Sequence, residues 1–215
     1  MNNLIWVFRE PRSGSSWVSN ALMKKLNKHL YHYDTHVDRN TEFDPLSFND
    51  NNMLYSTHLF HLLPQLKVID PYIIRTTRRN KTEQCLSMLY WNYFPDSIKH
   101  YFVDESKNTS MDNFNKSLVN PVTVTKDSII DLMLKMKQRD KLWADNFKDF
   151  KSDVIVYEDL MDQAHISKLD ITLSFNTETQ YSHKMPEYKT KAFKNYQQAV
   201  DWCEEIAQKL KFIQY

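Results

Sequence analysis

Glycine is almost absent from this chain, because Gly14 is the only one among 215 residues. At the average usage of about 7%, roughly fifteen would be expected. Turns elsewhere must therefore use Asn, Asp and Pro, which tolerate or pre-set turn geometry. The position of the one glycine is informative, since no other residue combines unrestricted φ with a backbone that lacks Cβ.

Cysteine is also scarce, and neither sign of charge dominates. Cys85 and Cys203 cannot form a disulfide framework and fit no metal-binding spacing. Lysine and arginine number 28 against 27 acidic residues, for a formal net charge of +1. This balance excludes the global positive field that holds nucleic acid nonspecifically. We therefore expect no nucleic-acid partner, and any anionic ligand must be held by a local group of cations.

Long apolar runs are missing as well. No stretch approaches the length needed to span a bilayer, and residues 1–8 are too short for a secretory signal. A hydrophobic content of 41% with 13% aromatic residues favours a packed core over disorder. These observations predict a soluble, cytoplasmic protein with no membrane partner, and they leave its oligomeric state open.

Apolar runs alternate along the chain with amphipathic stretches. The predicted strands are residues 4–8, a segment at Tyr31, and residues 53–57, 71–77 and 153–157. The predicted helices begin at Ser16 and Asn80 and cover 126–147 and 193–212. This alternation predicts an α/β fold of three layers with a central parallel sheet. We expect a single domain over 1–215, with the aromatic, asparagine-rich segment 91–124 as an insertion or lid.

The turn from Pro11 to Trp17 joins the first predicted strand to a helix. Its sequence is Pro-Arg-Ser-Gly-Ser-Ser-Trp. Helix N-termini bind phosphate, because their first N–H groups lack partners and carry a partial positive charge. Gly14 would let the backbone approach the anion closely, while Ser15, Ser16 and Arg12 would add donors. An ordinary serine-capped turn is the alternative. The second glycine and the lysine of a Walker A loop are absent.

This turn resembles the 5′-phosphosulfate-binding loop of sulfotransferases. The resemblance implies a P-loop-like nucleotide-binding topology and the sulfate donor 3′-phosphoadenosine-5′-phosphosulfate. It also implies which residues bind the 5′ phosphate, namely Arg12, Ser13, Gly14, Ser15 and Ser16. In the same family the tryptophan stacks on or beside the adenine, which would be the role of Trp17. On periodicity alone, Trp17 is a core residue of the helix.

A second group of basic residues follows the strand at 71–77. Arg79 precedes Ser87 by eight positions, and Ser87 falls inside the next predicted helix. A strand end and a helix start can bind one anion from two sides. This spacing is similar to the 3′-phosphate motif of sulfotransferases, so the resemblance implies that Arg79 and Ser87 bind the 3′ phosphate. A solvated basic strand end is the alternative.

The segment Leu54–Pro64 resembles the part of cytosolic sulfotransferases that carries their catalytic histidine. His58 aligns with that histidine and lies 21 residues before Arg79. A histidine near neutral pKa is suited to accept the proton of an attacking hydroxyl. His61 is its nearest rival. The family's lysine and proline around the histidine are replaced here by Ser56 and Phe60.

An acidic base is the other possibility, because the carbohydrate branch of sulfotransferases uses one elsewhere. Asp34, His36 and Glu42, in the segment 34–42 after the predicted strand at Tyr31, are the candidates. Later in the chain, Val154–Leu160 resembles the Tyr-Glu-Asp-Leu strand end of many sulfotransferases. We expect Glu158 or Asp159 to cap the segment that follows. The basic C-terminal loop of the family is missing, and its possible substitutes are Lys184, Lys189 and Lys191.

The resemblance implies in-line transfer of a sulfuryl group from 3′-phosphoadenosine-5′-phosphosulfate to a hydroxyl of a small molecule or carbohydrate. His58 would take the acceptor proton, and Arg12 would stabilise charge on the bridging oxygen. The product would be 3′-phosphoadenosine 5′-phosphate, and no metal is required. The alternatives are a P-loop nucleotide kinase or phosphotransferase, and a catalytically inactive module that binds the cofactor.

Overall fold

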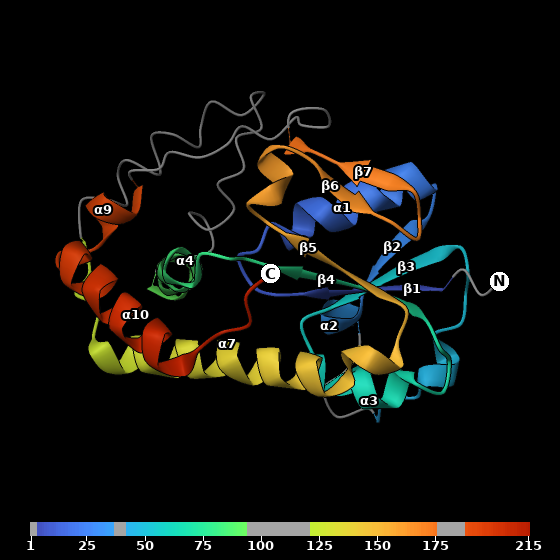
Figure 1. Ribbon diagram of the computed structural model, residues 1–215, viewed down its shortest axis with the longest axis horizontal. Coiled ribbons are helices and arrows are strands. Elements are labelled where there is room, and N and C mark those ends of the chain that lie inside the picture. The colour runs from blue at the N-terminus through green and yellow to red at the C-terminus, as the bar shows by residue number, and fades with distance from the viewer. Residues whose placement is uncertain (1–3, 37–41, 94–120, 176–187) are drawn as a thin grey trace. The chain divides into compact units, whose positions relative to one another are not determined.

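The computed structural model describes residues 4–36, 42–93, 121–175 and 188–215 (Figure 1). The chain forms two compact units. The first comprises Met1–Arg79, Met136–Glu178 and Ile213–Tyr215, and the second comprises Asn80–Lys135 and Thr179–Phe212. The single domain with an insertion at 91–124 stays a prediction, since residues 94–120 of that segment lie outside the described part.

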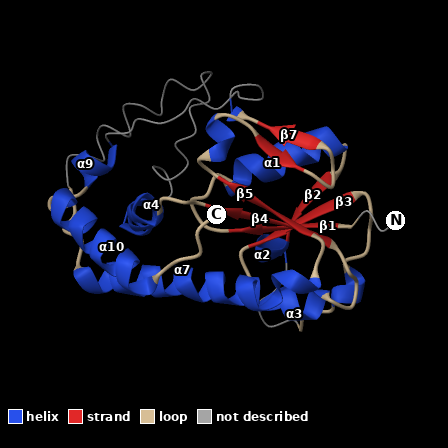
Figure 2. Cartoon of the chain, viewed as in Figure 1, coloured by secondary structure: helices blue, strands red, loops and turns tan. Residues whose placement is uncertain are grey.

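A five-stranded sheet forms the centre of the first unit (Figure 2). Its strands are β1 (Ile5–Arg9), β2 (His29–His32), β3 (Met53–Thr57), β4 (Tyr72–Thr77) and β5 (Ser152–Val156). They lie in the order β2-β3-β1-β4-β5, and every neighbouring pair is parallel. The predicted α/β fold with a central parallel sheet is therefore confirmed.

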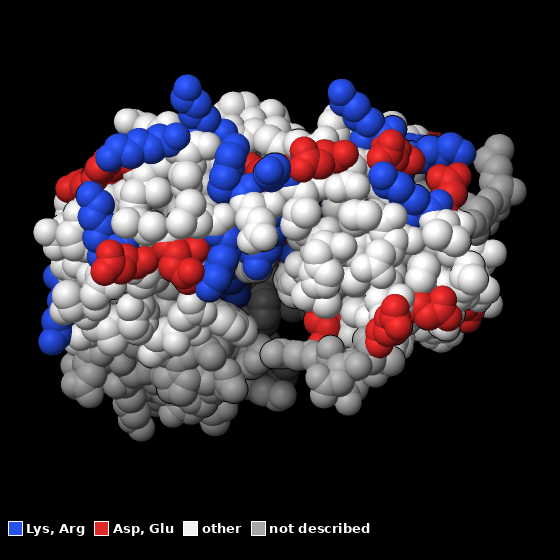
Figure 3. All heavy atoms as spheres, turned by 90° about the horizontal axis from the view of Figure 1, so that it is seen from below, with Lys and Arg blue, Asp and Glu red and all other residues white. Residues whose placement is uncertain are grey.

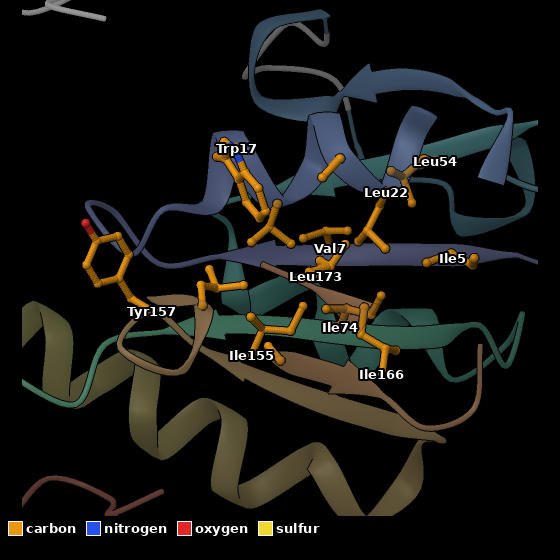
Figure 4. Close-up of a cluster of buried hydrophobic side chains, with 14 of the residues drawn as sticks. Ile5, Val7, Trp17, Leu22, Leu54, Ile74, Ile155, Tyr157, Ile166 and Leu173 are labelled. Atoms are coloured by element: carbon orange, nitrogen blue, oxygen red, sulfur yellow. The ribbon is translucent and has the colours of Figure 1, made fainter. Parts of the chain in front are cut away.

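The central strand β1 is buried on both of its faces. Ile5 and Val7 belong to the apolar cluster beneath α1 (Ser15–Leu26), which Figure 4 shows in close-up. Leu4, Trp6 and Phe8 belong to a second cluster on the opposite face. Successive side chains of a strand alternate between its faces, so a strand buried on both must be apolar throughout. This explains the continuous apolar run at the start of the chain.

Helices cover both faces of this sheet. On the face of α1 the cluster also includes the antiparallel hairpin of β6 (Ala164–Ile166) and β7 (Ile171–Leu173). The opposite face packs against η2 (Phe60–Leu62), α3 (Leu63–Leu66) and Trp143 of α7 (Lys126–Asn146). The remaining short elements of this unit are α2 (Tyr33–His36), η1 (Pro45–Ser47), η3 (Phe147–Asp149) and η4 (Asp159–Met161).

The second unit is helical in its described part. It contains α4 (Lys81–Tyr93), α9 (Tyr188–Ala192), α10 (Tyr196–Leu210) and the first turns of α7. The start of α4 is capped as predicted, because the side chain of Asn80 accepts a hydrogen bond from the N–H of Glu83 at 2.9 Å. Helix α10 packs on α4, where the free cysteines Cys85 and Cys203 are fully buried.

A buried ion cluster lies beneath the end of β4 in the first unit. The guanidinium of Arg75 is fully buried and donates to the carboxylates of Glu10 and Asp140 and to the hydroxyl of Tyr215. Thr77 donates to the second oxygen of Glu10 at 3.0 Å. Its carboxylate neighbours outweigh the effect of burial and raise the pKa of Arg75. The cluster connects the loop after β1, strand β4, helix α7 and the C-terminal segment.

On the face drawn in Figure 3, basic and acidic side chains of the described residues lie next to one another. An example of a surface pair is Lys67 with Asp149, whose charged atoms are 2.7 Å apart and whose side chains are about half exposed. Such pairs contribute little to stability, because water screens them.

We predict that Arg75→Met destabilises the protein by about 3–5 kcal/mol, because it leaves two buried carboxylates without their cation. Urea denaturation at neutral pH measures the change. The matched control, Lys67→Met, removes a solvent-exposed partner and should cost less than about 1 kcal/mol. Equal losses in the two variants would show that the buried cluster does not depend on Arg75.

Candidate functional site

The polar residues predicted from the sequence gather where the strands of the first unit end. Strand β1 leads into α1 on one face of the sheet, whereas its neighbour β3 leads into η2 and α3 on the other. Two adjacent parallel strands whose connections leave on opposite faces open a crevice at their carboxyl ends, where α/β proteins bind ligands. The turn around Gly14 follows β1 and His58 follows β3, so both lie at this carboxyl edge of the sheet, which we call the crevice.

The turn after β1 has an unusual backbone. Gly14 is the N-cap of α1 and has φ 70° and ψ 12°, in the left-handed region. Arg12 shares that region with φ 61°. The first helical hydrogen bond runs from Val18 N–H to the Gly14 carbonyl at 3.0 Å. The N–H groups of Ser15, Ser16 and Trp17 precede it and have no acceptor within the helix. No acidic residue stands in this first turn, so the helix terminus suits an anion.

Close packing is a second reason for glycine at position 14. A Cβ atom there would lie 2.8 Å from Cδ2 of Tyr157 and 3.6 Å from Cζ of Phe175. Real Cβ atoms do not approach a ring carbon so closely, so a larger residue must displace the aromatic ring. The tight turn and the end of β5 therefore fit together only because residue 14 has no side chain.

The serines of the turn differ in their surroundings. Ser13 is buried and its hydroxyl donates to the Glu10 carbonyl at 2.6 Å and contacts Oγ1 of Thr76 at 2.9 Å. That hydroxyl therefore ties the turn to β4. Ser15 is buried, Ser16 is exposed and Arg12 is half-buried. The phosphate contacts assigned to these residues stay predictions.

Trp17 lies in the core of the first unit. Its side chain is 8% exposed, and its ring meets the ring of Phe175 edge-on at a centroid distance of 4.6 Å. Figure 4 shows it on the first turn of α1, over the cluster that holds Val7. The structure therefore places Trp17 as its helical periodicity predicts. Stacking on adenine, which only the resemblance implies, stays a prediction.

The basic residues after β4 contact the acidic residues after β5. Arg79 donates through Nη2 to Asp159 at 3.0 Å and through Nε to the main-chain oxygen of Tyr215 at 3.1 Å. Glu158 accepts from the Arg79 N–H at 2.8 Å and pairs with Nε of Arg78 at 3.4 Å. Of the two predicted caps, Glu158 stands at the N-cap position of η4, but its side chain makes no capping hydrogen bond there. Parallel pairing of β4 with β5 brings these oppositely charged strand ends together.

Ser87, the predicted partner of Arg79, lies buried on α4. The two residues belong to different units, so their joint binding of a 3′ phosphate stays a prediction. Lys189 is buried and forms an ion pair with Glu83 in the second unit. Lys184 lies outside the described residues.

Asp34 ties the end of β1 to the end of β3. Its carboxylate accepts from Nη2 of Arg9 at 2.8 Å, from Oγ1 of Thr57 at 2.6 Å and from the N–H of His58 at 3.0 Å. Both oxygens of Asp34 are therefore engaged, which favours a positioning role over the alternative role of base. Glu42 is exposed, and the side chain of His36 lies outside the described part. Sequence reasoning missed Arg9, whose only signal was a charge directly after an apolar strand.

The ring of His58 is held in one orientation. Its Nδ1 contacts the carbonyl oxygen of Arg9, and a carbonyl can only accept, so Nδ1 carries the proton. In the neutral ring Nε2 then has the free lone pair. Burial and, next, the positive charge of Arg9 lower the pKa of His58, and the negative charge of Asp34 opposes them; together they bring it from 6.5 to about 4. His58 is consequently neutral at pH 7, with Nε2 able to accept a proton.

Ser56 and Phe60, which depart from the sulfotransferase pattern around His58, both make contacts inside the protein. Oγ of Ser56 lies 2.6 Å from Nδ1 of His32, at the paired ends of β3 and β2. Phe60 is buried, and its ring meets that of Phe8 edge-on at 5.4 Å. Both replacements therefore serve the packing beneath the site and leave His58 in its place at the strand end.

No protein-family model matches this chain, and no curated protein matches it. Within the described ranges, no three His, Cys, Asp or Glu side chains gather as a metal-binding group. None of the helices in the described ranges is both long and apolar enough to cross a membrane.

We predict that Gly14→Ala destabilises the protein by more than the roughly 1–2 kcal/mol that a left-handed alanine costs. The excess comes from the contact with Tyr157, so it should vanish when the substitution is made in a Tyr157→Ala background. Urea denaturation of the four proteins of this double-mutant cycle measures both parts. The same loss in both backgrounds would refute the proposed clash.

We also predict a pH-dependent stability that arises from His58. Below pH 6.5 the unfolded chain takes up a proton at His58, whereas the folded protein does so only near pH 4. The neutral form of His58 therefore contributes about 3 kcal/mol to the free energy of unfolding. This contribution is fully present above pH 6.5 and is lost as the pH falls to 4. Urea denaturation across this range should show a shallower pH dependence for His58→Gln. His61→Gln, at an exposed position, should follow the wild type, and three identical slopes would contradict the shift.

Proposed function

We propose that this protein is a sulfotransferase that moves a sulfuryl group from 3′-phosphoadenosine-5′-phosphosulfate to a hydroxyl acceptor. One observation carries the proposal. A neutral histidine whose Nε2 can accept a proton follows β3, next to the strand whose end opens into a left-handed glycine turn and a helix N-terminus. This crevice combines a base for a hydroxyl with a terminus suited to an anion.

The topology supports the same proposal. Strand β1 is central, β2 and β3 lie on one side of it, and β4 and β5 lie on the other. We propose that this is a P-loop-like nucleotide-binding arrangement in which the turn after the central strand receives phosphate. The distinguishing feature is the turn itself, because Arg12 and two serines replace the Walker glycine and lysine.

The residues of the turn fit the 5′ end of the donor. The N–H groups at the start of α1 would bind its 5′ phosphate, with Ser15, Ser16 and Arg12 as further donors. The hydroxyl of Ser13 holds the turn itself, so Ser13 would contribute through the shape of the turn. Arg79 would bind the 3′ phosphate after exchanging its exposed ion pair with Asp159, which is inexpensive to break.

Sulfuryl transfer requires the protein to position the two reactants and to neutralise the charge that develops in the transition state. The bound donor supplies an electrophilic sulfur and a phosphate leaving group. The acceptor oxygen forms a bond to sulfur while the bond between sulfur and the bridging oxygen breaks. His58 takes the acceptor proton on Nε2, and Arg12 stabilises the charge that develops on the bridging oxygen. Asp34 holds the main chain of His58, and the Arg9 carbonyl keeps the ring in the required tautomer.

Cofactor binding is the first test. Isothermal titration should show that 3′-phosphoadenosine 5′-phosphate binds and that ATP with Mg²⁺ does not. The reverse result would overturn the proposal in favour of a nucleotide kinase or other phosphotransferase. Arg12→Ala should weaken binding of the desulfated cofactor, whereas the surface variant Lys67→Ala should leave it unchanged.

Turnover is the second test. We predict that His58→Ala lowers the rate of sulfate transfer by roughly 10²–10⁴-fold, the usual contribution of a general base. Binding of 3′-phosphoadenosine 5′-phosphate should be retained, since His58 faces the acceptor. His61→Ala is the matched control, because that histidine is exposed one turn further along. A wild-type protein that binds the cofactor but transfers no sulfate would instead be the inactive cofactor-binding module.

A further inference from the structure

Arg139 is a half-buried cation that the proposed function does not yet use. It lies on α7 between Met136 and Trp143, three and four residues away, and both of these side chains are buried. Residues at such spacings share one face of a helix, so Arg139 is on the face of α7 that packs against the sheet. Asp140 beside it reaches the buried guanidinium of Arg75.

The neighbours of this face place Arg139 at the crevice. Trp143 belongs to the cluster that contains Phe8 and Phe60. Phe8 lies two residues before Glu10, and Phe60 lies two residues after His58. The charge of Arg139 acts on both Glu10 and His58. Arg139 therefore lies on the face of the sheet opposite α1, near enough for its charge to act on Glu10 and His58.

One nitrogen of the Arg139 guanidinium lacks a partner within the described residues. This nitrogen, Nη1, is fully buried and has no hydrogen-bond acceptor there. Burial lowers the pKa of Arg139, and the negative charge of Glu10 opposes that effect without forming an ion pair. A buried N–H group without an acceptor destabilises the folded protein. An anionic group in the crevice would remove that destabilisation.

We propose that Arg139 binds a carboxylate or sulfate group of the acceptor, so that the preferred acceptor is an anionic molecule carrying the reacting hydroxyl nearby. This inference rests on the proposed sulfotransferase function. The helix terminus and Arg12 would serve the donor from the α1 face, whereas Arg139 lies on the α7 face and its charge acts on His58, so an acceptor held by Arg139 would be near the base. The planar fork of arginine matches a carboxylate or sulfate through two parallel hydrogen bonds.

A counter-charge role is the structural alternative. Glu10 and Asp140 carry two negative charges against the one positive charge of Arg75, so Arg139 also balances the buried cluster. A lysine would keep that balance but lose the fork. Arg139→Lys therefore separates the two roles, because only anion binding requires the geometry of the guanidinium.

The experiment compares matched acceptors that differ in one charge. Methyl β-glucuronide is paired with methyl β-glucoside, and para-hydroxybenzoate with para-hydroxybenzamide, so the two arms also distinguish sugar from phenol acceptors. For at least one pair, kcat/KM of the wild type should favour the anion on the order of 10- to 100-fold. Arg139→Gln and Arg139→Lys should both reduce that ratio towards one. Lys141→Gln, on the exposed face of the same helix, should retain it.

Three results would overturn the inference. The wild type could use the neutral member of both pairs equally well, or Arg139→Lys could retain the full preference. Alternatively, both variants could lose activity equally on charged and neutral acceptors. That result would mean that Arg139 contacts the transferred sulfuryl group and not the acceptor. If Arg139→Gln does not fold by circular dichroism, Arg139→Lys alone decides.

Ligand-observed NMR of the same four probes, without nucleotide, supplies a readout that needs no turnover. Stronger binding of the anionic probes by the wild type than by Arg139→Lys supports the site, and equal binding of all four overturns it. Titration with 3′-phosphoadenosine 5′-phosphate tests the proposed function separately. A protein that binds this nucleotide but does not distinguish the probes refutes only the role of Arg139.

Discussion

The guanidinium of Arg75 is the contact on which the carboxyl edge of the sheet depends. It lies fully buried on β4 and binds Glu10 from the loop after β1, Asp140 from α7 and Tyr215 from the C-terminal segment. A buried cation must keep its carboxylate partners, because removing either side leaves an uncompensated charge in a medium of low polarity. Four distant parts of the chain are thereby held at one end of the sheet, which is the end where the candidate site forms.

A second ion pair performs a similar task nearer to the site. Asp34 binds the side chain of Arg9 and the main chain of His58, so the ends of β1 and β3 cannot separate. The carbonyl of Arg9 in turn accepts from the ring of His58 and determines its tautomer. The base of the proposed reaction is therefore oriented by a strand end, and its neutrality at pH 7 follows from burial beside two arginines.

Local sequence was sufficient for the longer elements and for the turn around Gly14. The apolar run of β1, the lone glycine and the amphipathic stretch of α1 each depend on residues close together in the chain, and the structure has them where the pattern predicts. The hairpin of β6 and β7 and the helix α3 were not predicted, because each has only three or four residues and too short a period to recognise. The helical spacing of the apolar residues after Gly14 also predicted correctly that Trp17 lies in the core.

Sequence alone thus determined the strand–turn–helix around Gly14, the parallel sheet and the position of a histidine at a strand end, since these follow from composition and short-range spacing. Tertiary structure decided which polar groups are engaged with one another. Asp34 positions His58, Arg79 pairs with Asp159, and the ring of Tyr157 requires glycine at position 14. Their partners lie far apart in the chain and meet only when parallel strands bring their ends to one edge. Arg139 belongs to the same class, because no local motif reveals that its helix crosses beneath that edge.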